Sequence, residues 1–245
     1  SVQESISSPD LYKKNNINST INILDSMSLH NCKKIIYSSS AAVYGDQNIQ
    51  PINENVELNP SSPYALTKLL CEKKINNACE QNNISGISLR YFNPIGYHSS
   101  NLFRDELTEN VGNIMQQIIK VALGKDKFIN IYGGDHLTKD GTCERDFVHI
   151  EDVLDAHIKS IKYMNFSNGH EIFNIGTGLP TSILQLINTF IDKNNIPISH
   201  KFSEKKLGDI KSCYADVEKI SIKMNWKASK DIQDMVIDAW NVYSK

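Results

Sequence analysis

Hydrophobic positions recur along the chain with two spacings, which predict helices and strands in alternation. In residues 9–30 a helical spacing places Ile17, Ile21 and Leu24 on one face, and the β-rich run "KKIIYSSS" (33–40) follows at once. Later strands are predicted at "GISLRYFN" (86–93), "FINIY" (128–132) and "EIFNIG" (171–176). Helices are predicted to begin at Ser62 and to cover residues 113–123, 151–163 and 182–194.

The regular alternation of strand and helix is typical of one architecture. It predicts an α/β fold, doubly wound, with a mostly parallel sheet, helices on both faces, and ligand sites at the carboxyl ends of the strands. After Ile196 the elements become shorter, and the last helix carries an apolar stripe from Ile232 to Trp240. We therefore expect a smaller α/β lobe, partly discontinuous in sequence, in the carboxyl-terminal part.

Composition and charge exclude several classes of protein. The chain has 245 residues, 40% of them hydrophobic, which is enough to bury a substantial core. The net charge is -2, and the three arginines form no basic stripe, so we expect no nucleic-acid partner. The sequence has no run of 18 apolar residues, so we expect no membrane span. Its five cysteines are scattered without a C-x-x-C spacing, which favours free thiols in the cytoplasm.

The segment "SSPYALTK" (61–68) has two interpretations. Ser62 can cap a helix and Pro63 can occupy its first turn, as at an ordinary helix start. Tyr64 and Lys68 are four residues apart, so they share a helix face, and an ammonium beside a phenol can make the phenol acidic. A chain of this composition contains about one such pair by chance. The pair alone therefore does not distinguish a helix start from a catalytic base.

A serine at the end of a strand changes that balance. The run Ser38 to Ser40 closes the strand at 33–40, and by itself Ser40 is better explained as a turn or cap residue. Tyr64 and Lys68 open the next helix at the same edge of the predicted sheet, so the three side chains can converge on one substrate hydroxyl. This combination resembles the short-chain dehydrogenase/reductase superfamily, in its extended sugar-nucleotide branch.

Further motifs narrow the resemblance to the UDP-glucose 4-epimerase (UDP-galactose 4-epimerase) family. They are "SSSAAVYGD", "NPSSPYALTK", "LRYFNPIGYH", "YGGDHLTKDGTCERDFVHIEDV" and "FNIGTG", in the family's order and spacing over essentially the whole chain. The resemblance implies a Rossmann-like fold, NAD as cofactor, a UDP-hexose substrate and a homodimer. It also implies interconversion of UDP-glucose and UDP-galactose through a transient 4-keto sugar, with the N-acetylhexosamine pair as a further candidate. No metal site is expected.

The resemblance also assigns roles to individual residues. Tyr64 is the expected base, Lys68 would stabilise its phenolate, and Ser40 would relay the proton or bind the ketone oxygen. The expected contacts of NAD are Asn15, Ser40, Tyr64, Lys68 and Phe92. The expected contacts of the substrate are Ser40, Tyr64, Asn93, Asn113, Ile114, Asn130, Ile131, Tyr132, Arg145, Lys206, Leu207, Gly208, Asp209 and Cys213.

Several of these substrate residues have plainer alternatives. Arg145 is expected at the UDP diphosphate, but a surface ion pair with a neighbouring acid would also explain it. Tyr132 is expected on uracil, or else in the core of a strand. Lys206 replaces a usual arginine, which keeps the charge and loses the planar fork. Cys213 matches a position beside the hexose C2, where a small thiol would admit an N-acetyl group; the alternative is an inert buried thiol.

The Gly-rich turn of the family does not occur in this sequence. Neither G-x-x-G-x-x-G nor G-x-G-x-x-G is present, and Gly176 and Gly178 are expected to form a tight turn. We expect that the first βαβαβ half lies outside this chain and that the chain alone is inactive. Residues 1–95 would then be the remainder of the NAD-binding domain. Residues 96–245 would form mainly the UDP-sugar lobe, with 127–180 partly returning to the Rossmann sheet.

Two other functions stay open at this point. A nucleotide-sugar 4,6-dehydratase would share the Tyr, the Lys and the 4-keto intermediate, but it needs acids to protonate the departing hydroxyl. Those enzymes typically continue the serine strand with Asp-Glu, whereas this chain has Ala41 and Ala42. The second alternative is an inactive fragment or interaction protein that lacks the NAD site.

Overall fold

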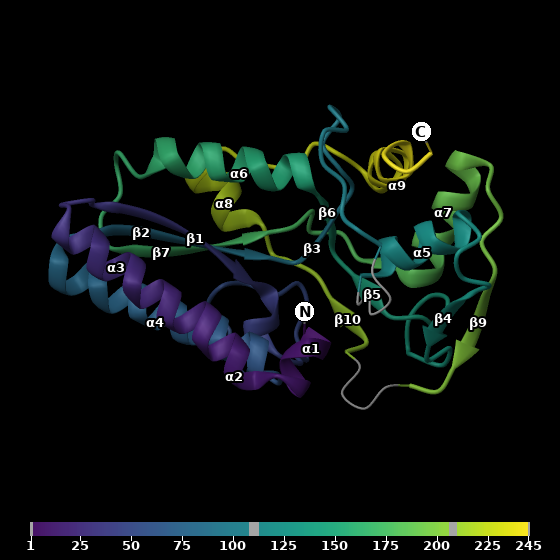
Figure 1. Ribbon diagram of the computed structural model, residues 1–245, viewed down its shortest axis with the longest axis horizontal. Coiled ribbons are helices and arrows are strands. Elements are labelled where there is room, and N and C mark those ends of the chain that lie inside the picture. Colours follow the sequence, from purple (N-terminus) through teal and green to yellow (C-terminus); the bar gives the residue numbers. More distant parts are fainter. Residues whose placement is uncertain (1, 108–112, 206–209, 245) are drawn as a thin grey trace. The chain divides into compact units, whose positions relative to one another are not determined.

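A computed structural model describes residues 2–107, 113–205 and 210–244 (Figure 1). Its helices are α1 (Val2–Ser7), α2 (Pro9–Tyr12), α3 (Ser19–Leu29), α4 (Pro63–Asn82), α5 (Ile114–Ala122), α6 (Ile150–Tyr163), α7 (Ile183–Asn194), α8 (Glu218–Met224) and α9 (Ile232–Asn241), with a π-helix at Lys13–Asn18 and a 3₁₀ helix at Ala41–Tyr44. Its strands are β1 (Lys34–Ser40), β2 (Ser85–Tyr91), β3 (Asn93–Ile95), β4 (Ile129–Tyr132), β5 (Glu144–Arg145), β6 (Phe147–His149), β7 (His170–Ile175), β8 (Thr181–Ser182), β9 (His200–Ser203) and β10 (Ser212–Cys213).

Local sequence explains where the main helices begin and end. The Ser62 hydroxyl accepts a hydrogen bond from Ala65 N at the start of α4, and Pro63 takes the first turn. The same helix ends at Asn83, which has a left-handed backbone conformation that asparagine tolerates well. Asp231 begins α9 with a capping box that includes Asp234. These caps satisfy backbone groups that the helix ends would otherwise leave without partners.

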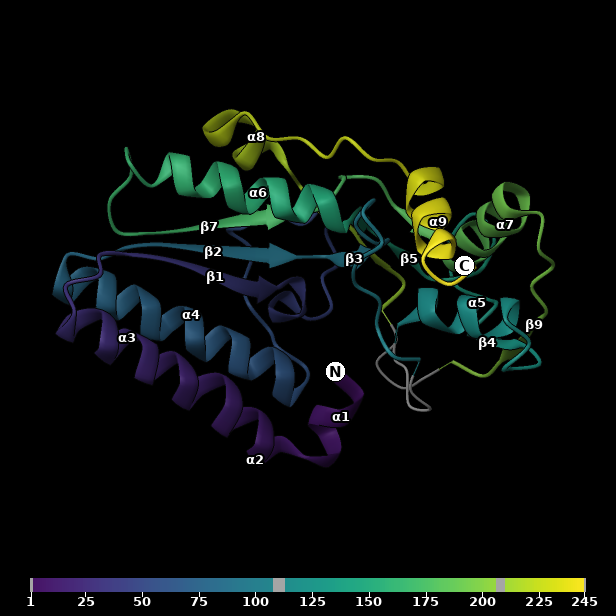
Figure 2. The same cartoon turned by 45° about the horizontal axis from the view of Figure 1, so that its top comes forward.

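The chain divides into two compact units. Unit 1 contains Ser1–Phe92, Asp155–Ile175 and Asp216–Trp226. Its sheet has the order β1-β2-β7, and all of its strand pairs are parallel. Helices α3 and α4 lie on one side of this sheet, with α6 and α8 on the other (Figures 1 and 2). This is the parallel sheet with helices on both faces that the sequence predicts, and Leu24, Met27, Ile75, Ala78, Cys79 and Ile84 form a core cluster within the unit.

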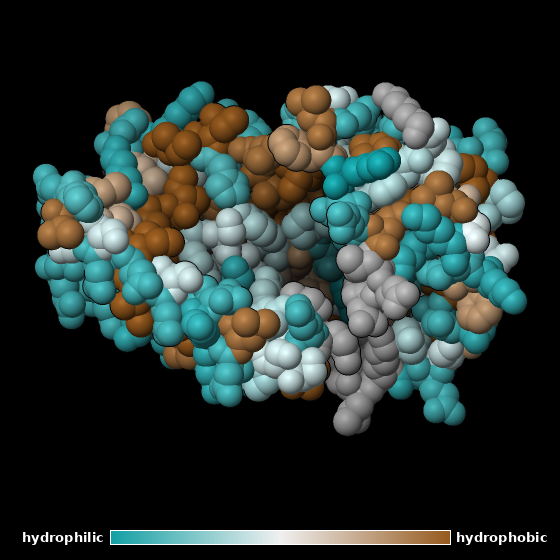
Figure 3. Space-filling model, viewed as in Figure 1, coloured by the Kyte–Doolittle hydropathy of each residue, from teal (hydrophilic) through white to brown (hydrophobic). Residues whose placement is uncertain are grey.

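Strand β1 is the outer strand of the described sheet of unit 1. Within the described residues it pairs only with β2. Ile35 and Ile36 are partly buried there and border two hollows, one also lined by residues of the π-helix and α3 and the other by Ile161 and Met164. Ile158, Ile161 and Ile222 are exposed on α6 and α8, and Figure 3 shows apolar surface over this region.

Unit 2 contains Asn93–Leu154, Gly176–Ala215 and Lys227–Lys245. Its strands form small sheets: β3 pairs with β6 and β4 with β9, both parallel, while β5 pairs parallel with β10 and antiparallel with β8. Helices α5, α7 and α9 supply much of its core, which includes Met115, Ile119, Leu186, Phe190, Met235 and Val236. The apolar stripe predicted for the last helix is therefore confirmed as a core face.

The predicted elements agree closely with the observed ones, with one local difference. The helix expected over residues 9–30 contains a π-helical stretch at Lys13–Asn18, which the spacing of apolar residues did not reveal. All five cysteines are free. Among the described residues, no helix combines the length and apolar character needed to cross a membrane.

Candidate active site

Ser40, Tyr64 and Lys68 come together in unit 1, as the sequence predicts. Ser40 ends β1, and its hydroxyl accepts a hydrogen bond of 3.2 Å from Ala42 N, which starts the following 3₁₀ helix. Tyr64 and Lys68 lie in successive turns of α4. The Ser40 hydroxyl lies close enough to Tyr64 to lower the pKa of its phenol. The backbone N–H of Tyr64 donates to the buried Ser5 hydroxyl at 3.1 Å, so α1 helps to fix the start of α4.

Lys68 is held beside two aromatic rings. Its Nζ donates to the Ser38 carbonyl oxygen at 2.7 Å and lies 5.0 Å from the centre of the Tyr37 ring. The same atom is 5.7 Å from the centre of the Tyr64 ring. Burial lowers the pKa of the Lys68 ammonium. The ammonium is therefore oriented by the end of β1 and faces the ring of Tyr64.

The acidity of Tyr64 is set mainly by burial. Burial raises the pKa of Tyr64, because a phenolate is poorly solvated inside the protein, and the nearby Ser40 hydroxyl opposes this by lowering the pKa. The sequence suggested Lys68 as the group that favours the phenolate. In the structure the Lys68 ammonium donates to the Ser38 carbonyl and lies 5.7 Å from the centre of the Tyr64 ring, and its effect on the phenolate stays a prediction.

A hollow of about 270 Å³ lies beside β1, and residues expected at the cofactor line it. Its lining includes Asn15, Asn16, Tyr37 and Lys68. Asn16 donates to the Thr67 hydroxyl at 2.8 Å, which ties the π-helix to α4. Amide and ammonium donors at the rim of a partly apolar hollow suit a ribose hydroxyl next to a flat ring. The residues present therefore fit the nicotinamide-ribose end of NAD.

Phe92 and Asn93 follow β2 in sequence and belong to different units. Phe92 is buried in unit 1, with its ring centre 6.3 Å from that of Tyr44. Asn93 is half-buried in unit 2, where its backbone N–H donates to the Asp146 carbonyl oxygen at 2.9 Å.

Arg145 and Cys213 are neighbours in unit 2. They are opposite each other in the parallel pairing of β5 with β10, and both are half-buried. The Arg145 Nη1 atom donates to the carbonyl oxygens of Glu144, at 2.8 Å, and Ile210, at 2.7 Å. These contacts orient the guanidinium through backbone groups. Tyr214, the residue after Cys213, is also half-buried.

The remaining substrate candidates differ in what they can offer a ligand. Asn113 caps α5, where its Oδ1 accepts from Met115 N at 2.9 Å, and Ile114 packs against the core of unit 2. Ile131 is buried, so only its backbone can reach a ligand, whereas Tyr132 is 36% exposed. Asn130, between them in sequence, is half-buried on β4. Lys206, Leu207, Gly208 and Asp209 lie outside the described residues.

Asp146 organises this part of unit 2, a role that its position in the sequence does not indicate. It is fully buried, and its carboxylate accepts from the backbone N–H groups of Thr177, Gly178 and Ala215 at 2.7, 2.9 and 3.1 Å. The turn predicted at Gly176 and Gly178 thus wraps around this carboxylate. A side chain at Gly176 would clash with Asp146 and Ala215, which explains the glycine.

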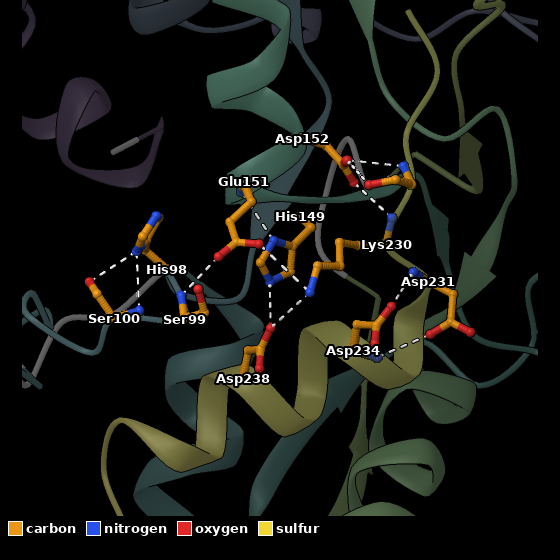
Figure 4. A network of polar contacts seen from close by, with 11 residues as sticks. His98, Ser99, Ser100, His149, Glu151, Asp152, Lys230, Asp231, Asp234 and Asp238 are labelled. Carbon is orange, nitrogen blue, oxygen red and sulfur yellow. Dashed lines mark hydrogen bonds and ion pairs between the residues drawn. The ribbon is translucent and has the colours of Figure 1, made fainter.

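Unit 2 also contains a buried histidine among charged groups (Figure 4). His149 is fully buried, and its Nδ1 accepts from Glu151 N at 3.0 Å. Its Nε2 lies 3.3 Å from Asp238 Oδ2, and Lys230 Nζ lies 3.6 Å from Glu151 Oε2 and 3.7 Å from Asp238 Oδ2. Figure 4 shows the ring of His149 between these three side chains.

The sequence of the chain is similar to those of known proteins. The model of the NAD dependent epimerase/dehydratase family matches residues 1–176. The chain is 33% identical over 240 residues to a UDP-glucose 4-epimerase from Bacillus subtilis, covering 98% of this chain and 71% of that protein.

Solved structures show the same fold. A UDP-glucose 4-epimerase from Stenotrophomonas maltophila, crystallised with NAD and formylated UDP-arabinopyranose, superposes with a TM-score of 0.97 at 32% identity, over 100% of this chain and 73% of that one. A UDP-Glc/GlcNAc 4-epimerase from Campylobacter jejuni gives a TM-score of 0.86 at 28% identity, over 100% and 74% of the two chains.

Proposed function

The chain belongs to the NAD dependent epimerase/dehydratase family, and we propose that it interconverts UDP-glucose and UDP-galactose through a transient 4-keto sugar, with NAD as cofactor. The observation that carries the proposal is the convergence of Ser40, at the end of β1, with Tyr64 and Lys68 in successive turns of α4, where Lys68 Nζ lies 5.7 Å from the centre of the Tyr64 ring. A tyrosine placed in this way can take a proton from one sugar hydroxyl and return it to the same oxygen.

Each residue of unit 1 has a distinct part in this mechanism. Tyr64 takes the proton from the hexose 4-hydroxyl, and Ser40 holds that oxygen and the Tyr64 hydroxyl in one hydrogen-bonded chain. Lys68, oriented by the Ser38 carbonyl, and Asn15 bind the nicotinamide ribose. Bound NAD supplies the hydride acceptor for C4 and a positive ring whose charge favours the Tyr64 phenolate.

Unit 2 supplies the residues that bind UDP. Arg145 suits the diphosphate, because a planar guanidinium pairs well with phosphate oxygens. Tyr132 keeps enough exposed surface to stack on uracil. Asn93 would contact the diphosphate or the sugar. We assign the hexose C2 side to Cys213, and we propose that UDP-N-acetylglucosamine is a second substrate, as it is for the UDP-Glc/GlcNAc 4-epimerase from Campylobacter jejuni.

The dehydratase alternative is less well supported. Elimination of water needs an acid next to the sugar, and the two residues after Ser40 are Ala41 and Ala42, with methyl side chains. Without an acid there, the 4-keto sugar is reduced again at C4. The product therefore distinguishes the two activities.

The test is a product assay with two preparations. The 245-residue chain is purified by itself and also joined to a dinucleotide-binding segment of the kind that the family carries at its amino end. We expect the joined protein to convert UDP-glucose to UDP-galactose with no net consumption of NAD. A 4-keto-6-deoxy sugar would establish the dehydratase instead. A folded joined protein that binds NAD and UDP but forms neither product would support the non-catalytic alternative.

Three expectations from the resemblance stay predictions. The chain by itself should not retain NAD, and stoichiometric NAD released on denaturing the purified chain would contradict this. The active protein should sediment as a homodimer. A cytoplasmic location is supported by five free cysteines, including the exposed Cys32, which suit a reducing compartment.

A further inference from the structure

A buried charged cluster lies directly behind Ser40. Glu72 and Arg90 are only 3% and 1% exposed, and their side chains pair through two hydrogen bonds of 3.0 Å (Arg90 Nε to Glu72 Oε1) and 2.6 Å (Arg90 Nη2 to Glu72 Oε2). Ser39 donates its hydroxyl proton to Glu72 Oε1 at 2.5 Å. One carboxylate therefore accepts three hydrogen bonds, two of them from a guanidinium.

These contacts connect the helix of Tyr64 to the strand of Ser40. Glu72 is eight residues after Tyr64 on α4, so Tyr64, Lys68 and Glu72 share one face of the helix. Ser39 and Arg90 are opposite each other in the parallel pairing of β1 with β2. The Glu72 carboxylate thus fixes α4 to both strands, at the residue that immediately precedes Ser40.

The same cluster also fixes the chain after Ser40. The Arg90 guanidinium lies 4.8 Å from the centre of the Tyr44 ring, at the end of the 3₁₀ helix that begins after Ser40. Tyr44 donates to Asn174 Oδ1 on β7 at 2.5 Å. Ser40 is therefore held from both sides, through Ser39 before it and through Tyr44 after it.

We propose that Glu72, acting with Arg90 and Ser39, is a positioning residue that holds the Ser40 hydroxyl in place beside Tyr64. Glu72 lies behind β1 and reaches the reaction through Ser39. The inference rests on the function proposed above, because it assigns Glu72 a part in that reaction.

The physical reason is the geometry of a bidentate ion pair. A guanidinium and a carboxylate that meet through two parallel hydrogen bonds fix each other's plane, and the third acceptor site then fixes the Ser39 hydroxyl. Weakening this arrangement frees the end of β1 to shift by a fraction of an ångström. The Ser40 hydroxyl beside Tyr64 lowers the pKa of the phenol, so moving Ser40 away leaves the effect of burial less opposed and the pKa of Tyr64 higher.

Two variants and one matched control test the proposal. Glu72→Gln keeps the shape and removes the charge, while Ser39→Ala removes the contact to β1 and leaves the ion pair intact. The control is Ser88→Ala, which removes a 2.8 Å hydrogen bond to His170 from an equally buried serine on β2. Ser39→Ala keeps the proposal testable even if Glu72→Gln fails to fold.

We expect kcat to fall on the order of tenfold to a hundredfold in Glu72→Gln and less in Ser39→Ala, because small misplacements near a reacting group have effects of this size. KM should stay within about twofold, since the UDP contacts lie elsewhere. The acid limb of the kcat profile should move to higher pH in both variants, because more base is needed to ionise Tyr64. Ser88→Ala should lower thermal stability without moving that limb.

A second readout does not depend on catalysis. The ¹³C resonance of the hydroxyl-bearing ring carbon of Tyr64, assigned with Tyr64→Phe, should shift in Glu72→Gln and Ser39→Ala and stay in place in Ser88→Ala. If the wild-type protein has no epimerase activity, the proposed function fails, and this resonance still shows whether Glu72 positions Tyr64. If folded variants leave the resonance and the pH profile unchanged, Glu72 has only a structural role and the proposal is wrong.

Discussion

The two units each bury a charged cluster, and the clusters differ in whether pH can change their charge. In unit 1 Glu72 pairs with Arg90, whose guanidinium stays protonated at any pH at which the protein is folded. In unit 2 the buried partner is His149, an imidazole that gains or loses its proton near neutrality. The first cluster supports the residues proposed for proton transfer, and the second joins α6 to α9.

The two clusters therefore affect different properties of the protein: the first affects proton transfer and the second affects the pH dependence of stability. A proton-transfer site needs supporting groups whose charge stays constant while the catalytic tyrosine itself titrates. The permanent ion pair of unit 1 meets that demand above the pH range in which carboxylates protonate. The histidine cluster of unit 2 makes part of the folding energy depend on pH instead. The substitutions below test this comparison.

The largest effect is expected from breaking the ion pair of unit 1 on one side. Glu72→Ala should lower the free energy of unfolding by about 3–5 kcal/mol, because it leaves the Arg90 charge buried without a partner. Urea unfolding at pH 7 measures the change. The double variant Glu72→Met/Arg90→Met removes both charges and should recover most of the loss. If the single variant is as stable as the double variant, leaving the Arg90 charge without Glu72 does not lower the free energy of unfolding, and the prediction is wrong.

Tyr64→Phe should separate chemistry from folding within unit 1. Removing the phenolic hydroxyl should lower turnover on the order of 100-fold or more, equivalent to about 2.7 kcal/mol, with little change in KM or in the unfolding midpoint. Lys68→Ala should weaken NAD binding in addition. Full activity in Tyr64→Phe would show that "SSPYALTK" is only a helix start.

Cys213→Tyr should change substrate choice through unit 2 alone. A phenol at this half-buried position would occupy volume that an N-acetyl group at C2 needs, and overpacking a closed site costs about 1–3 kcal/mol. Turnover of UDP-N-acetylglucosamine should therefore fall roughly 10- to 100-fold, while turnover of UDP-glucose is retained. Equal losses for both substrates would mean that Cys213 does not control the C2 side.

The smallest effect should come from the titration of His149. Burial lowers the pKa of His149 from its ordinary value of 6.5; the carboxylates of Asp238, Glu151 and Asp152 oppose this, and the Lys230 ammonium adds to it. The unfolded chain then binds more protons, so this contribution is complete above pH 6.5 and is lost as the pH falls through the folded pKa.

Urea unfolding between pH 5 and pH 7.5 measures this loss. One proton limits the slope to about 1.4 kcal/mol per pH unit. His149→Gln should flatten the profile, and Lys230→Met should move the loss to higher pH, because removing the facing cation makes protonation of the ring easier. An unchanged profile in both variants would show that His149 does not titrate in the folded protein.

The proximity of residues was predictable from the sequence where it follows from helix spacing or from the order of strands. Tyr64 and Lys68 follow a capped helix start, and Ser40 ends a strand, so their convergence follows from the order of elements in a parallel sheet. The same reasoning predicted the helices and strands closely, because their apolar periods are strong. The turn at Gly176 was also predictable, although the carboxylate at its centre was not.

Contacts set by the pairing of distant segments were not predictable. Glu72, in the run "CEKK", has the sequence pattern of a solvated helix face, and nothing local shows that Arg90 will lie beside it. The one available signal was that Glu72 continues the spacing of Tyr64 and Lys68 by one more turn. His149 and Asp238 are far apart in the sequence, so their proximity depends on how α9 packs rather than on local sequence.

The π-helix at Lys13–Asn18 constrains how this region can change in evolution. A π-turn is an α-helix with an extra residue accommodated in its ladder, so a one-codon deletion here would restore a regular α-helix. Such a deletion would rotate the preceding residues by about 100° relative to α3. Tyr12, which packs edge-on against Tyr64, and Thr20, which bonds to Cys71, could then no longer both keep their contacts with α4. Substitutions should therefore be tolerated in this segment far more often than changes in its length.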